Sequence, residues 1–460
     1  MTRTSLLPRA LACAALLGAA TACSDFLKVE NPGAEPIDKI GDPAYATLLV
    51  NGAIREFQKM IGDVALYSGD LSDEITAAHS NNSYRDLDRR VFDNSLDLVS
   101  LSYSPIQRAR FAADTAATIL MTQDGDKAGA DPQVARLLAL GGYSRVILGE
   151  TFCEAPLKVS APYKPDSLFR LAIVQFDSAI TIATAAKAAG NLPASADSIL
   201  NLALVGAARA ALNAGDKTKA IEYASKVAPG FDFRIPFAEG IPTTPGYPIN
   251  PFWNATGVPG TNGLATSNSS NGIAFSSASL WYIAGPTFQG LNDQRMPITS
   301  ARVSTMSTTA GLSTGFVPLR PKSFGGWTAT GTPISPGSSM RIASYVEAQY
   351  IIHEAEGGTA ATLAFINGER AQYQPASDGP STAATPDAIL AELRNQRRRE
   401  FYLDGHRLGD LRRYKAQYGL DYFTQGDYPN TANKTGSYGS ATCMPVPVSE
   451  YNGNPNMPRG

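Results

Sequence analysis

The segment RNQRRREFYLDGHRLGDLRRY, residues 394–414, carries seven arginines in twenty-one positions. Guanidinium groups at this density could bind a polyanion, stabilise charge in a reaction, or form ion pairs that hold a fold together. The whole chain has 39 Lys and Arg against 41 Asp and Glu, a net charge of -2. Because such a chain has no broad positive field, the sequence argues against nucleic-acid binding.

The phase of the predicted helix over residues 385–405 favours a structural role for this segment. Leu390 and Leu393 begin an apolar stripe, and Arg397 and Glu400 come next on the same face. Buried charges persist only when they are paired, and residues three positions apart on a helix can reach each other. We therefore predict a buried Arg397–Glu400 ion pair, with the remaining arginines solvated.

Three motifs resemble catalytic or metal sites, and each lacks a necessary part. GLSTG at 311–315 matches a nucleophile elbow but is followed by FVPLRP instead of a helix. HEAEGG at 353–358 lacks the second histidine of a zinc protease, and DGD at 124–126 lacks the glutamate of a calcium loop. With only three histidines, far apart in the chain, we expect no metal site and no cofactor.

The first half of the chain is predicted to form helical pairs. Apolar residues recur at three- and four-residue steps within 131–138, 166–183 and 200–211. The segment AALNAGDKTKAIEYASKVAP, 210–229, resembles the second half of a tetratricopeptide repeat, and 343–371 shows a weaker helix–turn–helix pattern. The predicted fold class is mainly α, with tetratricopeptide-like helical pairs.

The composition changes between these helical blocks. Clusters of Pro, Gly, Ser, Thr and Asn, such as NATGVPGTNGLATSNSSNG, are typical of irregular chain. We therefore expect one domain over 23–460, with a helical scaffold at about 40–228 and 340–415. The loop-rich excursion between them, about 229–339, is expected to display ligand-binding groups.

The N-terminus has the pattern of an export signal. Two arginines without acidic residues precede about thirteen small or apolar residues, so 1–22 is predicted to be a signal peptide. Thr21-Ala22-Cys23 resembles a lipobox, in which Cys23 becomes the lipidated first residue, although Ala20 stands where leucine is usual. The alternative is ordinary secretory cleavage after Ala22, which would leave no anchor.

The predicted export signal helps to assign the four cysteines of the chain. Cys13 leaves with the signal and Cys23 is assigned to the lipid, so Cys153 and Cys443 remain. In an oxidising compartment we predict a disulfide between them. The alternative is two unrelated buried thiols.

The arginine-rich segment also carries a family resemblance. RRREFYLDGHRLGDLRRY, 397–414, resembles the carboxy-terminal helix signature of SusD/RagB-type proteins. CSDFLKVENPG at 23–33, RIASYVEAQYIIHEAE at 341–356 and MPVPVSEYNGNPNM at 444–457 are similar to other parts of that family, in the same order. The resemblance spans nearly the whole chain but assigns no motif to 229–338.

The resemblance implies a SusD-like fold and a nutrient-binding lipoprotein anchored at the surface of the outer membrane. Such a protein would capture oligosaccharides or peptides, pass them to a SusC-like TonB-dependent transporter, and catalyse nothing. An exposed sugar site needs aromatic faces for C–H patches and polar groups for hydroxyls. The candidate ligand-binding residues are Trp253, Trp281, Tyr282, Trp327, Tyr84 and Arg85, each of which could instead belong to the core.

Two alternatives come from other functional classes. A secreted glycoside hydrolase needs two carboxylates, and Asp70, Asp73 and Glu74 are a possible set. A helical-repeat adaptor would bind only other proteins and retain no glycan or peptide.

Overall fold

The computed structural model describes residues 43–77, 82–238, 249–255, 282–303, 313–428 and 436–458. The chain divides into two units, 1–47 and 48–460. The helices and strands named below lie in the second unit, apart from the first two residues of α2. The expected signal peptide, Cys23 and Trp281 lie outside the described residues.

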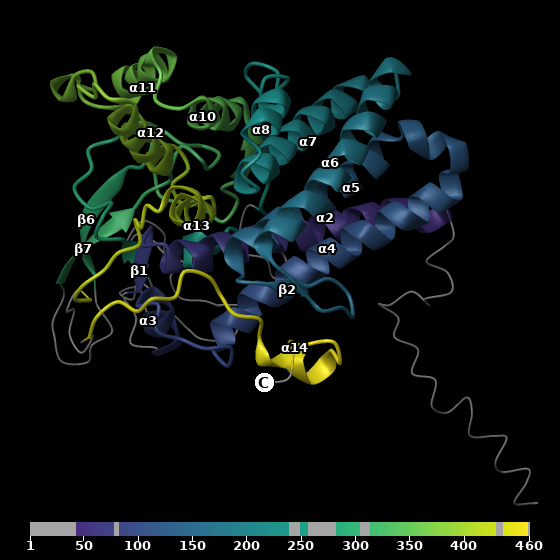
Figure 1. The fold of residues 1–460 in the computed structure, drawn as a ribbon, viewed down its shortest axis with the longest axis horizontal. Helices are drawn as coiled ribbons and strands as arrows, with labels where there is room; N and C mark the ends of the chain where they lie inside the picture. The colour runs from purple at the N-terminus through teal and green to yellow at the C-terminus, as the bar shows by residue number, and fades with distance from the viewer. Residues whose placement is uncertain are drawn as a thin grey trace, which may run out of the picture. The chain divides into compact units, whose positions relative to one another are not determined.

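Helices form most of the first half of this unit, and five of them have 20 or more residues. The helices are α2 (Ala46–Leu71), α3 (Asn82–Asp88), α4 (Asp97–Asp124), α5 (Pro132–Thr151), α6 (Pro165–Ala188), α7 (Pro193–Asn213) and α8 (Lys217–Ala224), with the 3-10 turn η3 (Gly125–Ala130) after α4. Helices α4, α5, α6 and α7 lie side by side in chain order (Figure 1). The predicted mainly α class is confirmed.

Local sequence explains several helix ends. The Asp131 carboxylate accepts a hydrogen bond from the Gln133 backbone N–H at 2.7 Å and so caps α5, as its position before a proline predicts. An apolar helical pattern was expected within 166–183, and α6 begins one residue before it, at Pro165. Asp166 lies in the first turn and pairs with Arg170 at 2.9 Å.

Small residues allow α5, α6 and α7 to pack closely. A Cβ atom at Gly142 of α5 would lie 2.8 Å from the Phe176 ring, and one at Gly206 of α7 would overlap the same ring. Phe176 of α6 therefore occupies space that only glycines leave open on both neighbouring helices.

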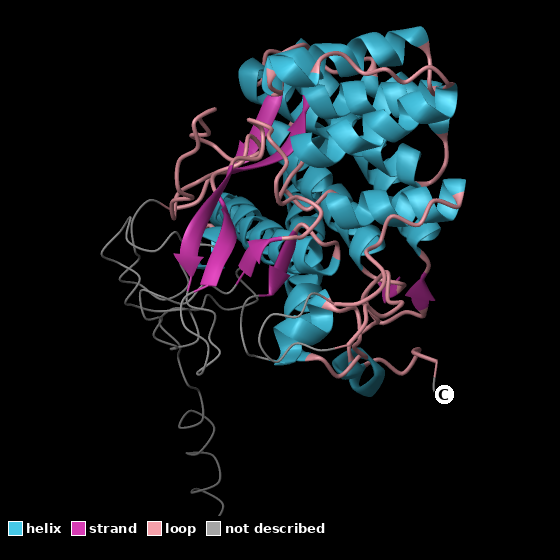
Figure 2. Cartoon of the chain, turned by 90° about the vertical axis from the view of Figure 1, so that its left-hand side faces the viewer, coloured by secondary structure: helices cyan, strands magenta, loops and turns pink. Residues whose placement is uncertain are grey.

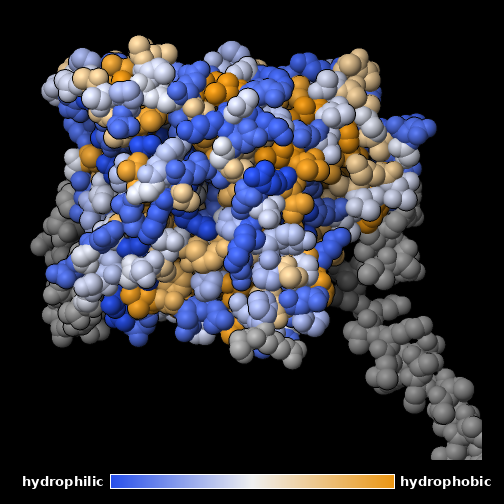
Figure 3. Space-filling view, viewed as in Figure 1, coloured by the Kyte–Doolittle hydropathy of each residue, from blue (hydrophilic) through white to orange (hydrophobic). Residues whose placement is uncertain are grey.

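Helix α6 alone, among the described residues, is long and apolar enough to cross a membrane. Its buried residues face α5 and α7, as expected of a core helix, and its exposed apolar residues include Leu171 and Val174. Figure 3 shows hydrophobic groups on the surface over the region of α5 to α7.

A second helical block follows in the last third of the chain. It comprises α10 (Tyr345–Glu356), α11 (Ala360–Tyr373), the 3-10 turn η4 (Ala376–Asp378), α12 (Pro386–Glu400), α13 (Arg407–Tyr418) and α14 (Val448–Gly453). Helix α10 packs on α7 and α8, and α13 packs on α5. These contacts join the two helical blocks into one scaffold.

The described part of the region 229–339 contains regular elements that its composition does not predict. It contains β4 (Asp232–Ile235), α9 (Pro251–Ala255), β5 (Tyr282–Ala284), β6 (Ile298–Val303) and β7 (Ser313–Pro318). Outside it lie β1 (Ile75–Ala77), β2 (Ala155–Pro156), β3 (Pro162–Tyr163) and β8 (Met340–Ser344). The described part of this loop-rich region therefore contains short strands and one short helix between its loops.

Every described strand pair is antiparallel. The pairs are β1–β5, β2–β3, β4–β8 and β6–β7, with Ile75 opposite Ala284 in the first. Figure 2 shows strands along one side of the helices. Because β1 and β8 adjoin scaffold helices, the pairs β1–β5 and β4–β8 tie the excursion to the scaffold.

The arginine-rich segment forms two helices joined by a turn. Thr385 caps α12 through a hydrogen bond from the Ala388 N–H, as expected. The helix ends at Glu400 instead of continuing to Gly405, which lies in the turn with φ of 86°. Tertiary contacts explain the early end, since the Leu403 N–H donates to the Glu74 carboxylate at 2.9 Å.

The predicted disulfide between Cys153 and Cys443 is present, with Cα atoms 5.2 Å apart. Two backbone hydrogen bonds flank it: the Cys153 N–H donates to Met444 O and the Met444 N–H donates to Thr151 O, both at 2.9 Å. The bond therefore connects the end of α5 to the carboxy-terminal segment.

Candidate functional site

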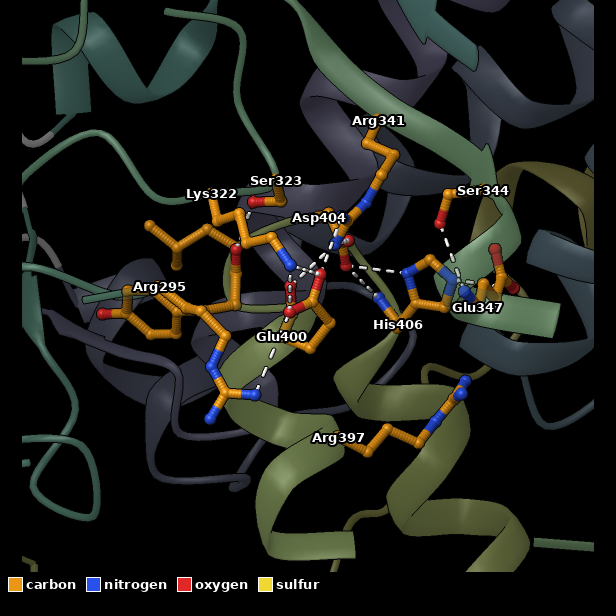
Figure 4. A network of polar contacts seen from close by, with 12 residues as sticks. Arg295, Lys322, Ser323, Arg341, Ser344, Glu347, Arg397, Glu400, Asp404 and His406 are labelled. Atoms are coloured by element: carbon orange, nitrogen blue, oxygen red, sulfur yellow. Dashed lines mark hydrogen bonds and ion pairs between the residues drawn. The ribbon is translucent and has the colours of Figure 1, made fainter. Parts of the chain in front are cut away.

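Glu400, the last residue of α12, lies at the centre of a buried group of cations. Its carboxylate accepts hydrogen bonds from Arg341 at 2.9 Å and from Lys322 at 2.8 and 2.9 Å, and Arg295 lies 3.9 Å away (Figure 4). Burial by itself would raise the pKa of Glu400, but these cations hold it below its ordinary value. The side chain is 0% exposed, so no substrate reaches it.

Arg397 has a different partner from the predicted one. Its Nε donates to Asp410 of α13 at 2.8 Å, and Asp410 also accepts from Arg413 at 2.8 Å. Arg413 in turn holds both oxygens of Glu354 at 2.9 Å. Burial would raise the pKa of Asp410, and the two guanidinium groups hold it well below its usual range.

The predicted Arg397–Glu400 ion pair is therefore wrong, although both residues are buried as expected. A helix periodicity shows which face is buried but does not show which segment packs against it. Here Glu400 meets cations of β8 and of the excursion, while Arg397 meets an acid of α13.

His406 lies between two carboxylates in the turn region. Its Nδ1 is 2.7 Å from Asp404 and its Nε2 is 3.0 Å from Glu347 of α10, as Figure 4 shows. Arg209 of α7 contacts the same Nε2 at 2.8 Å and pairs with Glu150 of α5 at 2.6 Å. Burial and Arg209 lower the pKa of His406, but the two carboxylates outweigh them and raise it.

This arrangement does not form a catalytic site. His406 is buried, and the adjoining void, which Arg209, Arg341 and Asp404 also line, measures about 20 Å³. That volume admits about one water molecule. The late arginines and their acidic partners therefore brace α5, α7, α10, α12 and α13 from inside.

The carboxylates of the hydrolase alternative are also buried. Asp70 and Glu74 are 0% exposed and Asp73 is 7% exposed. Burial raises the pKa of Glu74 to about 8 and also raises the pKa of Asp73, which accepts a hydrogen bond from Thr287 at 2.8 Å. A glycosidase pair must contact the scissile bond, so this burial argues against a hydrolase built on these residues.

Trp327 is a partly exposed aromatic residue of the excursion. Its Nε1 donates to Gln294 O at 2.8 Å, and its ring lies edge-on to Tyr373 at 6.3 Å. Lys322 Nζ lies 4.1 Å from the centre of the Tyr373 ring. Trp327 thus contacts Tyr373, whose ring also lies beside Lys322, a partner of Glu400.

The other candidate ligand residues lie in separate surroundings. Tyr84 and Arg85 are half-buried on α3, where burial raises the pKa of Tyr84 to about 12 and Arg85 lies 3.5 Å from Asp86. Trp253 is half-buried on α9. Tyr282 lies on β5 opposite Ala77. The described contacts do not bring Tyr84, Trp253 and Trp327 together.

The sequence did not predict two surface depressions of the described chain. One, of about 450 Å³, lies beside the disulfide and includes Phe92, Asp93 and Asn94. The other, of about 440 Å³, lies between α4, the β2–β3 turn and α14 and includes Phe111. The sequence FDNS at 92–95 joins an aromatic ring to polar side chains, which was the available signal for the first depression.

The helical scaffold with its strand-tied excursion defines a known fold class, that of SusD-like proteins. Surface glycan-binding protein A from Bacteroides uniformis matches with a TM-score of 0.60 and 12% identity, over 90% of this chain and 98% of that one. A laminarin binding SusD-like protein matches at 0.59 and 16%, over 90% and 98%. A SusD homolog from Bacteroides thetaiotaomicron matches at 0.59 and 14%, over 91% and 97%.

Sequence comparison agrees with this fold for the carboxy-terminal block. The SusD family model matches residues 344–459, which include α10 to α14. No curated protein sequence matches the chain. The carboxy-terminal block thus matches the SusD family model, and the SusD-like fold extends over most of the chain, which together support assignment to the SusD/RagB family.

Proposed function

We propose that this protein is a non-catalytic binding protein that captures oligosaccharides and delivers them to a TonB-dependent outer-membrane transporter. The observation that carries this proposal is the SusD-like fold over about 90% of the chain, which is also the fold of a laminarin binding protein and a surface glycan-binding protein. The burial of the carboxylate and histidine clusters supports a binding role over a hydrolytic one.

Binding and turnover can be tested together. The mature protein is titrated calorimetrically with a panel of neutral oligosaccharides and short peptides, and each mixture is then analysed by mass spectrometry for cleavage. We expect an oligosaccharide to be retained intact. Cleavage products would identify a hydrolase, and retention of peptides alone would reassign the cargo.

The transporter partnership calls for a separate experiment. A tagged chain expressed in its own host is purified in mild detergent, and co-purifying proteins are identified. We expect a SusC-like barrel of the outer membrane to co-purify. A barrel that co-purifies with a chain that retains neither glycan nor peptide would favour the adaptor alternative.

Surface attachment would depend on a lipid at Cys23, because the preceding residues have the pattern of a lipoprotein signal. Metabolic labelling with a fatty-acid analogue is expected to label the wild-type protein and not Cys23→Ala. Equal labelling of the two would refute the anchor and favour ordinary cleavage after Ala22.

A further inference from the structure

The depression beside the Cys153–Cys443 disulfide has two walls. Residues 92–94 form one wall, and residues 440–443 with Pro445 form the other. Its volume of about 450 Å³ lies within the roughly 300–1,000 Å³ that is usual for small-molecule sites. This volume is therefore sufficient for one sugar ring.

Polar groups in this depression have free hydrogen-bonding capacity. Within the described chain, no residue hydrogen-bonds to the Asn94 side-chain amide or to the hydroxyls of Ser440 and Thr442. Asp93 uses its Oδ1 to accept from the Ser95 N–H at 2.8 Å and the Ser95 hydroxyl at 2.6 Å, which leaves its Oδ2 open. The depression thus offers a carboxylate, an amide and two hydroxyls.

The remaining lining is apolar. Phe92 is half-buried and is an aromatic member of the lining, which also includes both half-cystines, Ala441 and Pro445. An aromatic surface suits the C–H patches of a sugar ring, while amide and carboxylate groups bind its hydroxyls. The lining includes the Asp93 carboxylate and no cation, so an anionic sugar would be repelled.

We propose that this depression is a subsite for one neutral sugar ring of a captured oligosaccharide, with Phe92, Asp93, Asn94 and Thr442 as its contacts. The proposal rests on the glycan-binding function proposed above and adds the place and the charge preference of one ring. The disulfide is a positioning element for the second wall. Its flanking backbone bonds hold that wall at Met444, and the Gly439 N–H donates to Arg89 O at 2.7 Å at its other end.

The test compares variants of the mature protein by calorimetry with laminarin oligosaccharides, starch dextrins and oligogalacturonate. Phe92→Ala and Asn94→Ala are expected to bind the best neutral ligand about tenfold more weakly, the effect of losing about 1.4 kcal/mol. Phe111→Ala is the matched control, since this phenylalanine is 60% exposed and lines the other depression. It is expected to bind within twofold of wild type.

Charge preference gives a second readout. The wild-type protein is expected to bind oligogalacturonate more weakly than neutral chains. Asp93→Asn removes the carboxylate charge, so the difference in affinity between neutral and anionic chains is expected to become smaller. Phe92→Trp keeps an aromatic face, so it should retain binding and report occupancy as a change in tryptophan fluorescence. Melting temperatures verify that each variant is folded.

The possible outcomes distinguish a failure of the proposed subsite from a failure of the proposed function. If the wild-type protein binds a neutral oligosaccharide and Phe92→Ala and Asn94→Ala bind it equally well, the subsite is refuted while the function stands. If the wild-type protein binds no glycan, both proposals fall. Unchanged affinity after reduction of the disulfide in a folded protein would remove the positioning role from Cys153 and Cys443.

Discussion

Glu400 carries a charge that three cations share inside the protein. Arg341 and Lys322 donate to it and Arg295 lies within 4 Å, so its carboxylate compensates buried positive charge from separate segments. Removing one member of such a cluster leaves uncompensated buried charge, which costs more than the net contribution of the intact cluster.

The substitution Glu400→Gln is expected to lower the free energy of unfolding by about 3–5 kcal/mol. The amide keeps the shape of the side chain but removes the negative charge from beside Arg341 and Lys322. Urea titration at neutral pH measures the loss. Glu222→Gln is the control, since Glu222 is 60% exposed beside Lys226 and should change stability by less than about 0.5 kcal/mol. Equal effects of the two substitutions would contradict the buried cluster.

Glu74 differs from Glu400 in that its pKa is raised and not lowered. Its Oε1 accepts from the Leu403 N–H, its Oε2 has no partner among the described residues, and burial raises its pKa from 4.5 to about 8. Between these pH values the folded protein retains a proton that the unfolded chain has released. The contribution of Glu74 to stability is thus complete below pH 4.5 and is lost as pH rises through about 8.

Glu74→Gln should therefore favour the folded state more at high pH than at low pH. The stability difference between variant and wild type is expected to shift toward the variant by at most about 4 kcal/mol from pH 5 to pH 8, since each pH unit contributes up to about 1.4 kcal/mol. Urea titrations at pH 5, 6.5 and 8 measure the shift. A difference that does not vary with pH would show that Glu74 titrates normally in the folded state.

At the scale of elements, close approach of helices determines where the scaffold tolerates side chains. Phe176 of α6 packs edge-on against Tyr143 of α5 with ring centres 5.1 Å apart, and Gly206 of α7 faces the same ring. In α11, Gly368 is exposed and has nothing within 4 Å of a Cβ position. The two glycines therefore differ in packing while both lie within helices.

Alanine at these two glycines is expected to have opposite effects. Gly206→Ala should lower stability by about 1–3 kcal/mol, because the added methyl group overpacks the contact with Phe176. Gly368→Ala should raise it by about 0.5–1 kcal/mol through helix propensity alone. Thermal and urea unfolding of both variants provide the comparison. Stabilisation by Gly206→Ala would show that the helices have room to move apart.

At the scale of the whole molecule, the Cys153–Cys443 disulfide joins residues separated by 290 positions. It connects the end of α5 in the first helical block to the segment after the second block. A cross-link that closes so long a loop restricts the unfolded chain most strongly in the chain-entropy account.

The double variant Cys153→Ala/Cys443→Ala is expected to lose up to about 5 kcal/mol of stability. Urea titration with and without reductant tests this, since reductant should destabilise the wild-type protein and leave the double variant unchanged. A wild-type protein insensitive to full reduction would show that helix contacts alone set the stability.

The sequence by itself determined features that depend on neighbours along the chain. Apolar periodicity placed the helices, Asp131 and Thr385 marked helix starts, and cysteine count with an export signal left Cys153 and Cys443 as the sole candidate pair. The arginine-rich signature indicated the family. These signals are local, because a helix repeats every 3.6 residues and its caps lie next to it.

Only the tertiary structure decided which distant groups meet. It gave Glu400 the cations of other segments, gave Arg397 an acid from α13, and ended α12 at Glu400, where the turn reaches Glu74. It also brought residues 92–94 beside the disulfide. Periodicity specifies that a charge is buried, but the identity of its partner depends on how separate segments pack, and this information is not local to any stretch of the chain.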